Sequence, residues 1–137
     1  MARRKGRIIA FQALYSWEMG NTDLDNLLSF SWVGEEKLSK MDDDVLTFAR
    51  LLVSGTIEHL EEIDSAIKSN LNENWDFSRL NKVDLAILRI SAYPILFQKD
   101  IHPSIVIDEA IDISKEFGTD DSFKFINAVL DSIRKAG

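Results

Sequence analysis

The chain has 137 residues, of which 45% are hydrophobic and 28% are charged, and it contains no cysteine. This length and composition predict a single domain over residues 1–137 with a core of its own, and they exclude a disulfide framework and thiol chemistry. The 23 acidic and 16 basic residues give a formal net charge of −7 at pH 7, which argues against a protein that wraps nucleic acid over its whole surface.

Positive charge is concentrated at the N-terminus. The first seven residues contain Arg3, Arg4, Lys5 and Arg7 and no acidic residue. A basic arm (residues 1–7) that runs straight into a helix is typical of a segment that contacts phosphates, although short basic N-termini are also common without such a role.

The residues after this arm indicate neither a secretory signal nor a membrane anchor. Gln12, Ser16 and Glu18 interrupt the apolar residues that follow the arm, and no segment of the chain approaches the roughly 20 apolar residues of a membrane span. We therefore expect a cytoplasmic protein with no membrane partner.

Apolar residues at three- and four-residue steps predict helices along the chain, and no alternating pattern of a strand competes with them. The predicted helices cover residues 9–17, 24–32, 41–67, 80–97, 103–117 and 122–133. Thr22 or Asp23 is expected to cap the second helix, and Thr119, Asp120 or Asp121 the last one. The fold class is therefore all-α, with six or seven helices around one buried helix.

Three features of the longer helices carry further expectations. Gly55 in the middle of the 41–67 helix predicts a close crossing with another helix. The 80–97 segment is apolar nearly all round, which is typical of a central helix, and Pro94 predicts a kink or an early end near Tyr93. Pro103 fits the first turn of the next helix, and Gly118 is expected at the C′ position that follows it.

The sequence shows little that predicts catalysis. His59 and His102 lie in different elements, and phosphate-binding glycine loops and zinc-protease motifs are absent. Clusters of acidic residues, such as 42–44, are most simply explained as solvated faces or as partners of helix N-termini. We therefore expect no enzyme, no cofactor and no metal site.

Arg89 is an unusual charge because it lies within the apolar central helix. An unpaired cation there would cost several kcal/mol. Three interpretations are therefore open. Arg89 forms a structural ion pair with Asp84 or with an acid of the last helix, or the end of its side chain reaches the surface, or it presents a cation at a groove between helices.

Two aromatic residues lie beside the predicted apolar stripes instead of on them. Tyr15 follows the basic arm, and Phe125 lies on the last helix, where the stripe is expected to run through Phe123 and Ile126. Exposed rings near basic residues can stack on unpaired bases, so Tyr15 and Phe125 are candidates for RNA contact.

Several segments of the chain resemble the NusB family of bacterial transcription antitermination factors. These are residues 13–17 after the arginine-rich start, residues 86–93 in the central helix, and the C-terminal series 107–111, 117–118 and 121–131. The resemblance extends over the whole chain, with a departure at Pro94, where the family usually has an acidic residue.

This resemblance implies an all-helical fold of two packed subdomains and a non-enzymatic RNA-binding function. Members pair with NusE, a protein of the small ribosomal subunit, and bind single-stranded boxA RNA in nascent transcripts, notably ribosomal RNA precursors, within an antitermination complex with RNA polymerase. The positions that match the family's RNA surface are Arg3, Arg4, Lys5, Arg7, Tyr15, Arg89, Asp121, Lys124 and Phe125. Asp84 matches an acidic position that faces NusE.

Two other function classes remain open from the residues alone. One is a helical protein–protein adaptor whose basic end is incidental, and the other is a small enzyme if an acidic cluster binds a metal. Salt-dependent RNA binding that requires the basic arm would distinguish the RNA-binding class from both.

Overall fold

A computed structural model describes residues 2–20, 23–30, 34, 36, 39–71, 76–98 and 100–136. The elements in this part are the α-helices α1 (Ala2–Glu18), α2 (Leu24–Ser29), α4 (Asp43–Glu58), α5 (Leu60–Ser69), α6 (Lys82–Phe97), α7 (Pro103–Phe117) and α8 (Ser122–Ala136), and the 3-10 helix η2 (Phe77–Arg79). No strand occurs among these residues, so the all-α prediction is confirmed. The candidate cap Thr22 and the predicted extension of the second helix to Trp32 lie outside the described residues.

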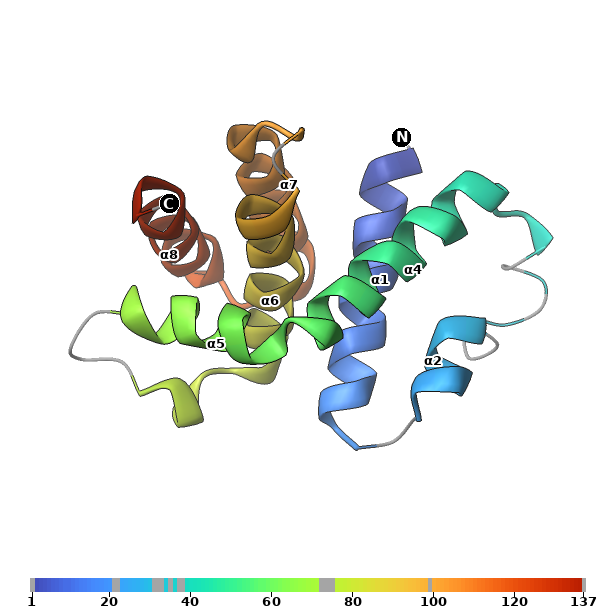
Figure 1. Ribbon diagram of the computed structural model, residues 1–137, viewed down its shortest axis with the longest axis horizontal. Coiled ribbons are helices and arrows are strands. Elements are labelled where there is room, and N and C mark those ends of the chain that lie inside the picture. Colours follow the sequence, from blue (N-terminus) through green and yellow to red (C-terminus); the bar gives the residue numbers. More distant parts are fainter. Residues whose placement is uncertain are drawn as a thin grey trace.

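The helices form two groups that share α6. In Figure 1, α1, α2 and α4 lie on one side, while α5, α7 and α8 surround α6 on the other. Helix α6 packs against α1, α4, α5, α7 and α8, and its residues from Asp84 to Ala92 are all buried. This arrangement confirms the prediction of two packed subdomains around a central buried helix.

Helix α6 begins with a side-chain cap and continues through its proline. The Asn81 side chain accepts a hydrogen bond from the backbone N–H of Val83 at 2.8 Å. Of the two alternatives at Pro94, the early end near Tyr93 is wrong, because the helix continues through Pro94 to Phe97, and the kink stays a prediction. Pro94 cannot donate to the preceding turn, but its carbonyl still accepts from the backbone N–H of Gln98 at 2.9 Å.

The predicted single helix over residues 41–67 is interrupted at His59. Helix α4 ends at Glu58, α5 begins at Leu60, and Figure 1 shows a clear change of direction between them. The apolar stripe continues through the bend, but α4 packs mainly on α1 and α5 on α6. The one apolar stripe therefore packs against two different helices, because the bend at His59 gives α4 and α5 different directions.

The crossing of α4 and α6 next to this bend requires Gly55. A Cβ atom at Gly55 would overlap the ring of Tyr93 on α6, which confirms the predicted close crossing. Next to this crossing, the His59 ring stacks on Phe97, with the two ring centroids 4.2 Å apart.

The turn between α7 and α8 is equally tight. Gly118 is the C-cap residue of α7 and not a left-handed C′ residue; its φ is −94°. A Cβ there would lie 2.7 Å from the Ser114 carbonyl oxygen and from the Ser122 Oγ, so the glycine is needed for space. Before α8, the Thr119 backbone N–H donates to Ser122 Oγ at 2.9 Å, and which of Thr119, Asp120 and Asp121 caps the helix stays a prediction.

Candidate nucleic-acid interface

The basic N-terminal residues do not form a separate arm. Helix α1 begins at Ala2, so residues 2–7 are its first turns, and the predicted start at Ile9 was too late. These turns pack against α4: a Cβ at Gly6 would lie 3.3 Å from the Val45 carbonyl oxygen and closer still to the Phe48 ring. The packing fixes the directions in which the basic side chains leave the helix.

The basic side chains of α1 fall into two environments. Arg4 is about half exposed and pairs with Asp112 of α7 at 3.3 Å, and Lys5 is exposed. Arg7 is only 2% exposed; it pairs with Glu109 of α7, and its guanidinium lies 5.2 Å from the Phe48 ring centroid. Arg4 and Lys5 can therefore reach a phosphate, whereas Arg7 ties α1 to α7. The side chain of Arg3 lies outside the described part.

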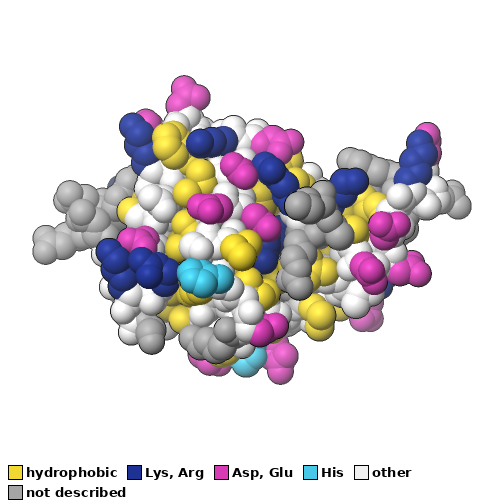
Figure 2. Space-filling view, turned by 90° about the horizontal axis from the view of Figure 1, so that it is seen from above, with side chains coloured by type: hydrophobic (Ala, Val, Ile, Leu, Met, Phe, Trp, Pro, Cys, Tyr) yellow, Lys and Arg dark blue, Asp and Glu magenta, His cyan; other side chains and the backbone are white. Residues whose placement is uncertain are grey.

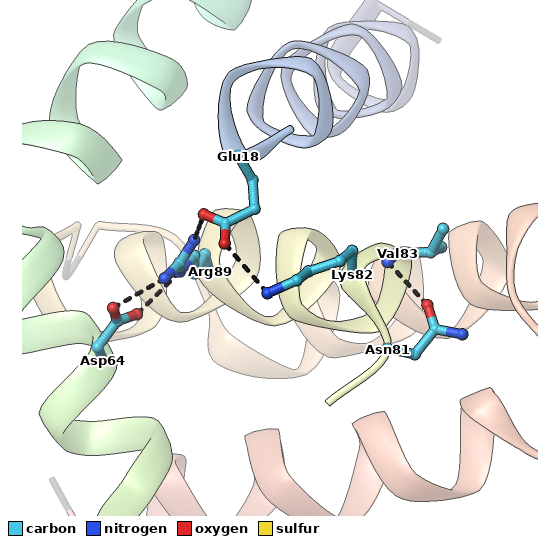
Figure 3. Close-up of polar contacts among 6 residues, drawn as sticks. All are labelled: Glu18, Asp64, Asn81, Lys82, Val83 and Arg89. Carbon is cyan, nitrogen blue, oxygen red and sulfur yellow. Dashed lines mark hydrogen bonds and ion pairs between the residues drawn. The ribbon is translucent and has the colours of Figure 1, made fainter. Parts of the chain in front are cut away.

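Arg89 is held in a buried ion-pair cluster that joins three helices. Its Nε and Nη2 donate to the two carboxylate oxygens of Asp64 on α5, each at 2.9 Å, and its Nη1 donates to Glu18 on α1 at 2.9 Å. Glu18 also pairs with Lys82 at 3.2 Å, and Figure 3 shows the four side chains converging. The expected partners, Asp84 or an acid of the last helix, were wrong, because the acids come from α1 and α5.

The electrostatics of this cluster favour its charged form. Burial by itself raises the pKa of Glu18, but hydrogen bonds from Arg89 and Lys82 outweigh burial and hold this pKa below its ordinary value. Burial likewise disfavours the Arg89 cation, and the hydrogen bonds to Asp64 and Glu18 outweigh it, so the Arg89 pKa is raised. Arg89 is 6% exposed. Its guanidinium therefore links α6 to α1 and α5 and is not presented at a groove between helices.

A pocket of about 720 Å³ lies between the end of α5, the start of α6 and the first half of α8. Four of the predicted functional residues line it, namely Asp84, Asp121, Lys124 and Phe125. Sequence reasoning placed these residues on two helices, and the turn at Gly118 brings the start of α8 beside the start of α6.

Asp84 differs from expectation in its exposure. The resemblance implied an acid that faces NusE, but Asp84 is 9% exposed, and its Oδ1 has no hydrogen-bond partner among the described residues. Burial raises the pKa of Asp84, an effect that the nearby Ser122 hydroxyl reduces. A donor group that enters the pocket could satisfy this oxygen atom.

The aromatic candidates divide between surface and core. Tyr15 is 36% exposed on α1, as its position beside the apolar stripe predicted. On α8, Phe123 and Phe125 are both half-buried: Phe125 packs against the hydrophobic core, whereas Phe123, which was expected to be buried, lies beside the lysines of α7 and α8. The buried side of α8 runs through Ile126, Val129, Leu130 and Ile133 as predicted, with Ser122 and not Phe123 buried in its first turn.

Charges of both signs share the surface of the molecule. On the face drawn in Figure 2, Lys and Arg side chains lie among Asp and Glu side chains. Within the described part of the chain, no three His, Asp or Glu side chains come together in a way that could hold a metal ion. No helix there is long and apolar enough to cross a membrane.

The residues that sequence reasoning missed are mainly the acidic partners of the arginines. Glu18 and Asp64 hold Arg89, and Asp112 and Glu109 hold Arg4 and Arg7. An arginine in an apolar helix indicated that acids must surround it, but the sequence did not contain the information on which helices would supply them.

Comparisons with known proteins agree with this architecture. The sequence model of the NusB family matches residues 4–135. Transcription antitermination protein NusB of Treponema denticola is 54% identical over 134 residues, which cover 98% of this chain and 96% of that protein.

Two solved structures extend the similarity to the fold. NusB of T. maritima superposes with a TM-score of 0.83 at 37% identity, covering 97% of this chain and 90% of that chain. A chain of the crystal structure of antitermination factors NusB and NusE in complex with dsRNA superposes with a TM-score of 0.85 at 32% identity, covering 99% and 98% of the two chains.

Proposed function

The chain belongs to the NusB family, and we propose that it binds single-stranded boxA RNA together with a NusE protein. As a member of this family it is a transcription antitermination factor and not an enzyme. The observation that carries the proposal is the superposition of 99% of the chain on a chain of the NusB–NusE–dsRNA crystal structure. The RNA targets would be nascent transcripts, including ribosomal RNA precursors, read in the cytoplasm within an RNA polymerase antitermination complex.

The exposed cations of α1 would supply the phosphate contacts. Arg4 and Lys5 are open to solvent, and Arg3 lies in the same first turn. Three phosphate contacts on a single strand correspond to a log–log salt slope of about −2. Arg7 and Arg89 are held in buried ion pairs, so their role would be to position α1 against α7, α5 and α6.

The aromatic and pocket residues would supply the contacts that depend on unpaired bases and on the protein partner. Tyr15 offers an exposed ring on α1, and Lys124, Phe125 and Asp121 lie together at the α8 pocket. Asp84, at the wall of the same pocket, would accept a hydrogen bond from a NusE group, because its Oδ1 has no partner in the described part of the chain.

The acidic surface explains why a partner would be needed. With a net charge of −7, the chain by itself gains little from counterion release. A basic ribosomal partner would add phosphate contacts beside those of α1 and would limit binding to the shared surface.

An electrophoretic mobility-shift titration with boxA RNA tests the proposal. The chain and NusE together should retain single-stranded boxA RNA more tightly than either protein alone, and more tightly than a scrambled strand or the same sequence as a duplex. The comparison with the duplex is needed because the related crystal structure contains dsRNA. Binding of NusE with no preference for boxA would instead identify a protein–protein adaptor.

A further inference from the structure

Phe123 is an aromatic ring that the proposed RNA contacts do not use. It is half-buried, and the core packs against Phe125 and Phe117 but not against Phe123. Two ammonium groups lie close to its ring: Lys115 Nζ of α7 is 5.1 Å and Lys124 Nζ of α8 is 5.9 Å from the centroid. An aromatic ring flanked by two exposed lysines from different helices is a typical arrangement for a strand of RNA.

Lys115 lies between the basic start of α1 and the Phe123 ring of α8. On α1, Arg4 is held by Asp112 of α7 at 3.3 Å. Lys115 follows Asp112 by three residues on the same helix, and residues at this spacing are neighbours on a helix surface. The order along the surface is therefore Arg4, Asp112, Lys115, Phe123 and then Lys124.

From this order we propose that Phe123 is a base-stacking platform and that Lys115 and Lys124 contact the phosphates on either side of the stacked base. The inference rests on the proposed RNA binding and extends it, because it places a continuous RNA path from the start of α1 across the end of α7 to α8. A base that stacks on Phe123 displaces a lysine from the ring, and the freed ammonium group then meets a phosphate.

Acidic residues beside the path limit it to this route. Glu116 follows Lys115 on α7, and Asp120 and Asp121 precede α8, and all three are exposed. Their repulsion of phosphate disfavours a strand that leaves the Lys115–Phe123–Lys124 patch on either side. The Lys115–Phe123–Lys124 patch combines two cations with one aromatic ring. RNA binding there therefore depends both on the salt concentration and on base stacking.

Two substitutions test the path, each with a matched control. Phe123→Ala removes the ring, and its control is Phe97→Ala, which removes a 37% exposed ring at the opposite end of α6. Lys115→Gln removes one cation, and its control is Lys135→Gln, an exposed lysine in the last turn of α8. Phe123→Leu keeps an apolar side chain without a π face, so it separates loss of stacking from any loss of folding.

Fluorescence anisotropy with boxA RNA and NusE gives the affinities. We expect Phe123→Ala and Phe123→Leu to weaken RNA binding at least about fivefold. Lys115→Gln should make the log–log salt slope shallower by about 0.7, and both controls should bind as the unmodified chain does. Photocrosslinking with 4-thiouridine RNA should label the peptide that contains Phe123.

The outcomes separate this inference from the proposed function. If the unmodified chain with NusE binds no RNA, the proposed function fails, and the path fails with it. If the unmodified chain binds RNA and both Phe123 variants bind equally well, or if the crosslinks spare the Phe123 peptide, the path is wrong while the proposed function stands.

Discussion

Replacing Arg89 with methionine should destabilise the protein without altering the RNA contacts of the molecules that remain folded. Arg89 donates two hydrogen bonds to Asp64 and one to Glu18, all at 2.9 Å, and is 6% exposed. Removing one member of a buried ion-pair cluster leaves the other charges without compensation, which costs about 3–5 kcal/mol. For a chain of this size the melting temperature should fall by about 10–20 °C.

The dependence of stability on pH should change as well. The folded-state pKa of Glu18 lies below its ordinary value, so its ion pairs stabilise the fold above the ordinary glutamate pKa, and this contribution is lost as the pH falls through the folded pKa. In Arg89→Met only Lys82 remains to lower this pKa, so the acid-induced loss of stability that comes from Glu18 should be smaller.

Urea unfolding followed by circular dichroism, at neutral and at acidic pH, measures both effects. Arg89→Met/Asp64→Leu should recover part of the loss, because it removes a carboxylate that would otherwise be buried without its partner. A loss of unfolding free energy below about 1 kcal/mol for Arg89→Met would refute the assignment of Arg89 as a tie between helices. Lower RNA affinity in the fully folded variant would point to a direct role in binding.

Four further variants test the surface. Arg4→Gln combined with Lys5→Gln should make the salt slope of RNA binding shallower by about 1.4, as measured by titrations at several salt concentrations. Tyr15→Ala should weaken RNA binding by about 1–3 kcal/mol with an unchanged melting temperature, and a large drop in melting temperature with normal affinity would mark the ring as structural. Asp84→Lys should weaken NusE binding in titration calorimetry more than RNA binding to the free chain; unchanged NusE affinity with an intact fold would reject the assignment. Asp121→Asn should tighten RNA binding, less so at high salt, since it removes repulsion between a carboxylate and phosphate; a loss of affinity would mean that Asp121 accepts a hydrogen bond.

The sequence predicted the architecture because apolar spacing reflects burial directly. The central helix is apolar nearly all round since five helices pack on it, and Gly55 lies where the Tyr93 ring leaves no space for a side chain. The bend at His59 was not predictable in the same way. The apolar stripe continues through it, and only the choice of different partners for α4 and α5 breaks the helix.

The candidate site was predictable in its residue types but less so in its geometry. Sequence spacing identified Arg89 as unusual, yet its acidic partners come from helices far apart in the chain. On α8 the sequence predicted the helix start and most of the buried side, and only the first buried residue differs, since Ser122 and not Phe123 is buried. Ser122 and Phe123 lie four and three residues before Ile126, so helical spacing places both on the side of Ile126, and the apolar pattern favoured the phenylalanine.

The most direct test of the account is the affinity of the chain with NusE for single-stranded boxA RNA, measured by fluorescence anisotropy over a range of salt concentrations. The account predicts binding that exceeds that of a scrambled strand, with a contribution from the chain's α1 cations of about −2 to the log–log salt slope. Equal affinity for boxA and scrambled RNA, or a slope that does not change when Arg4 and Lys5 are replaced by glutamine, would contradict it.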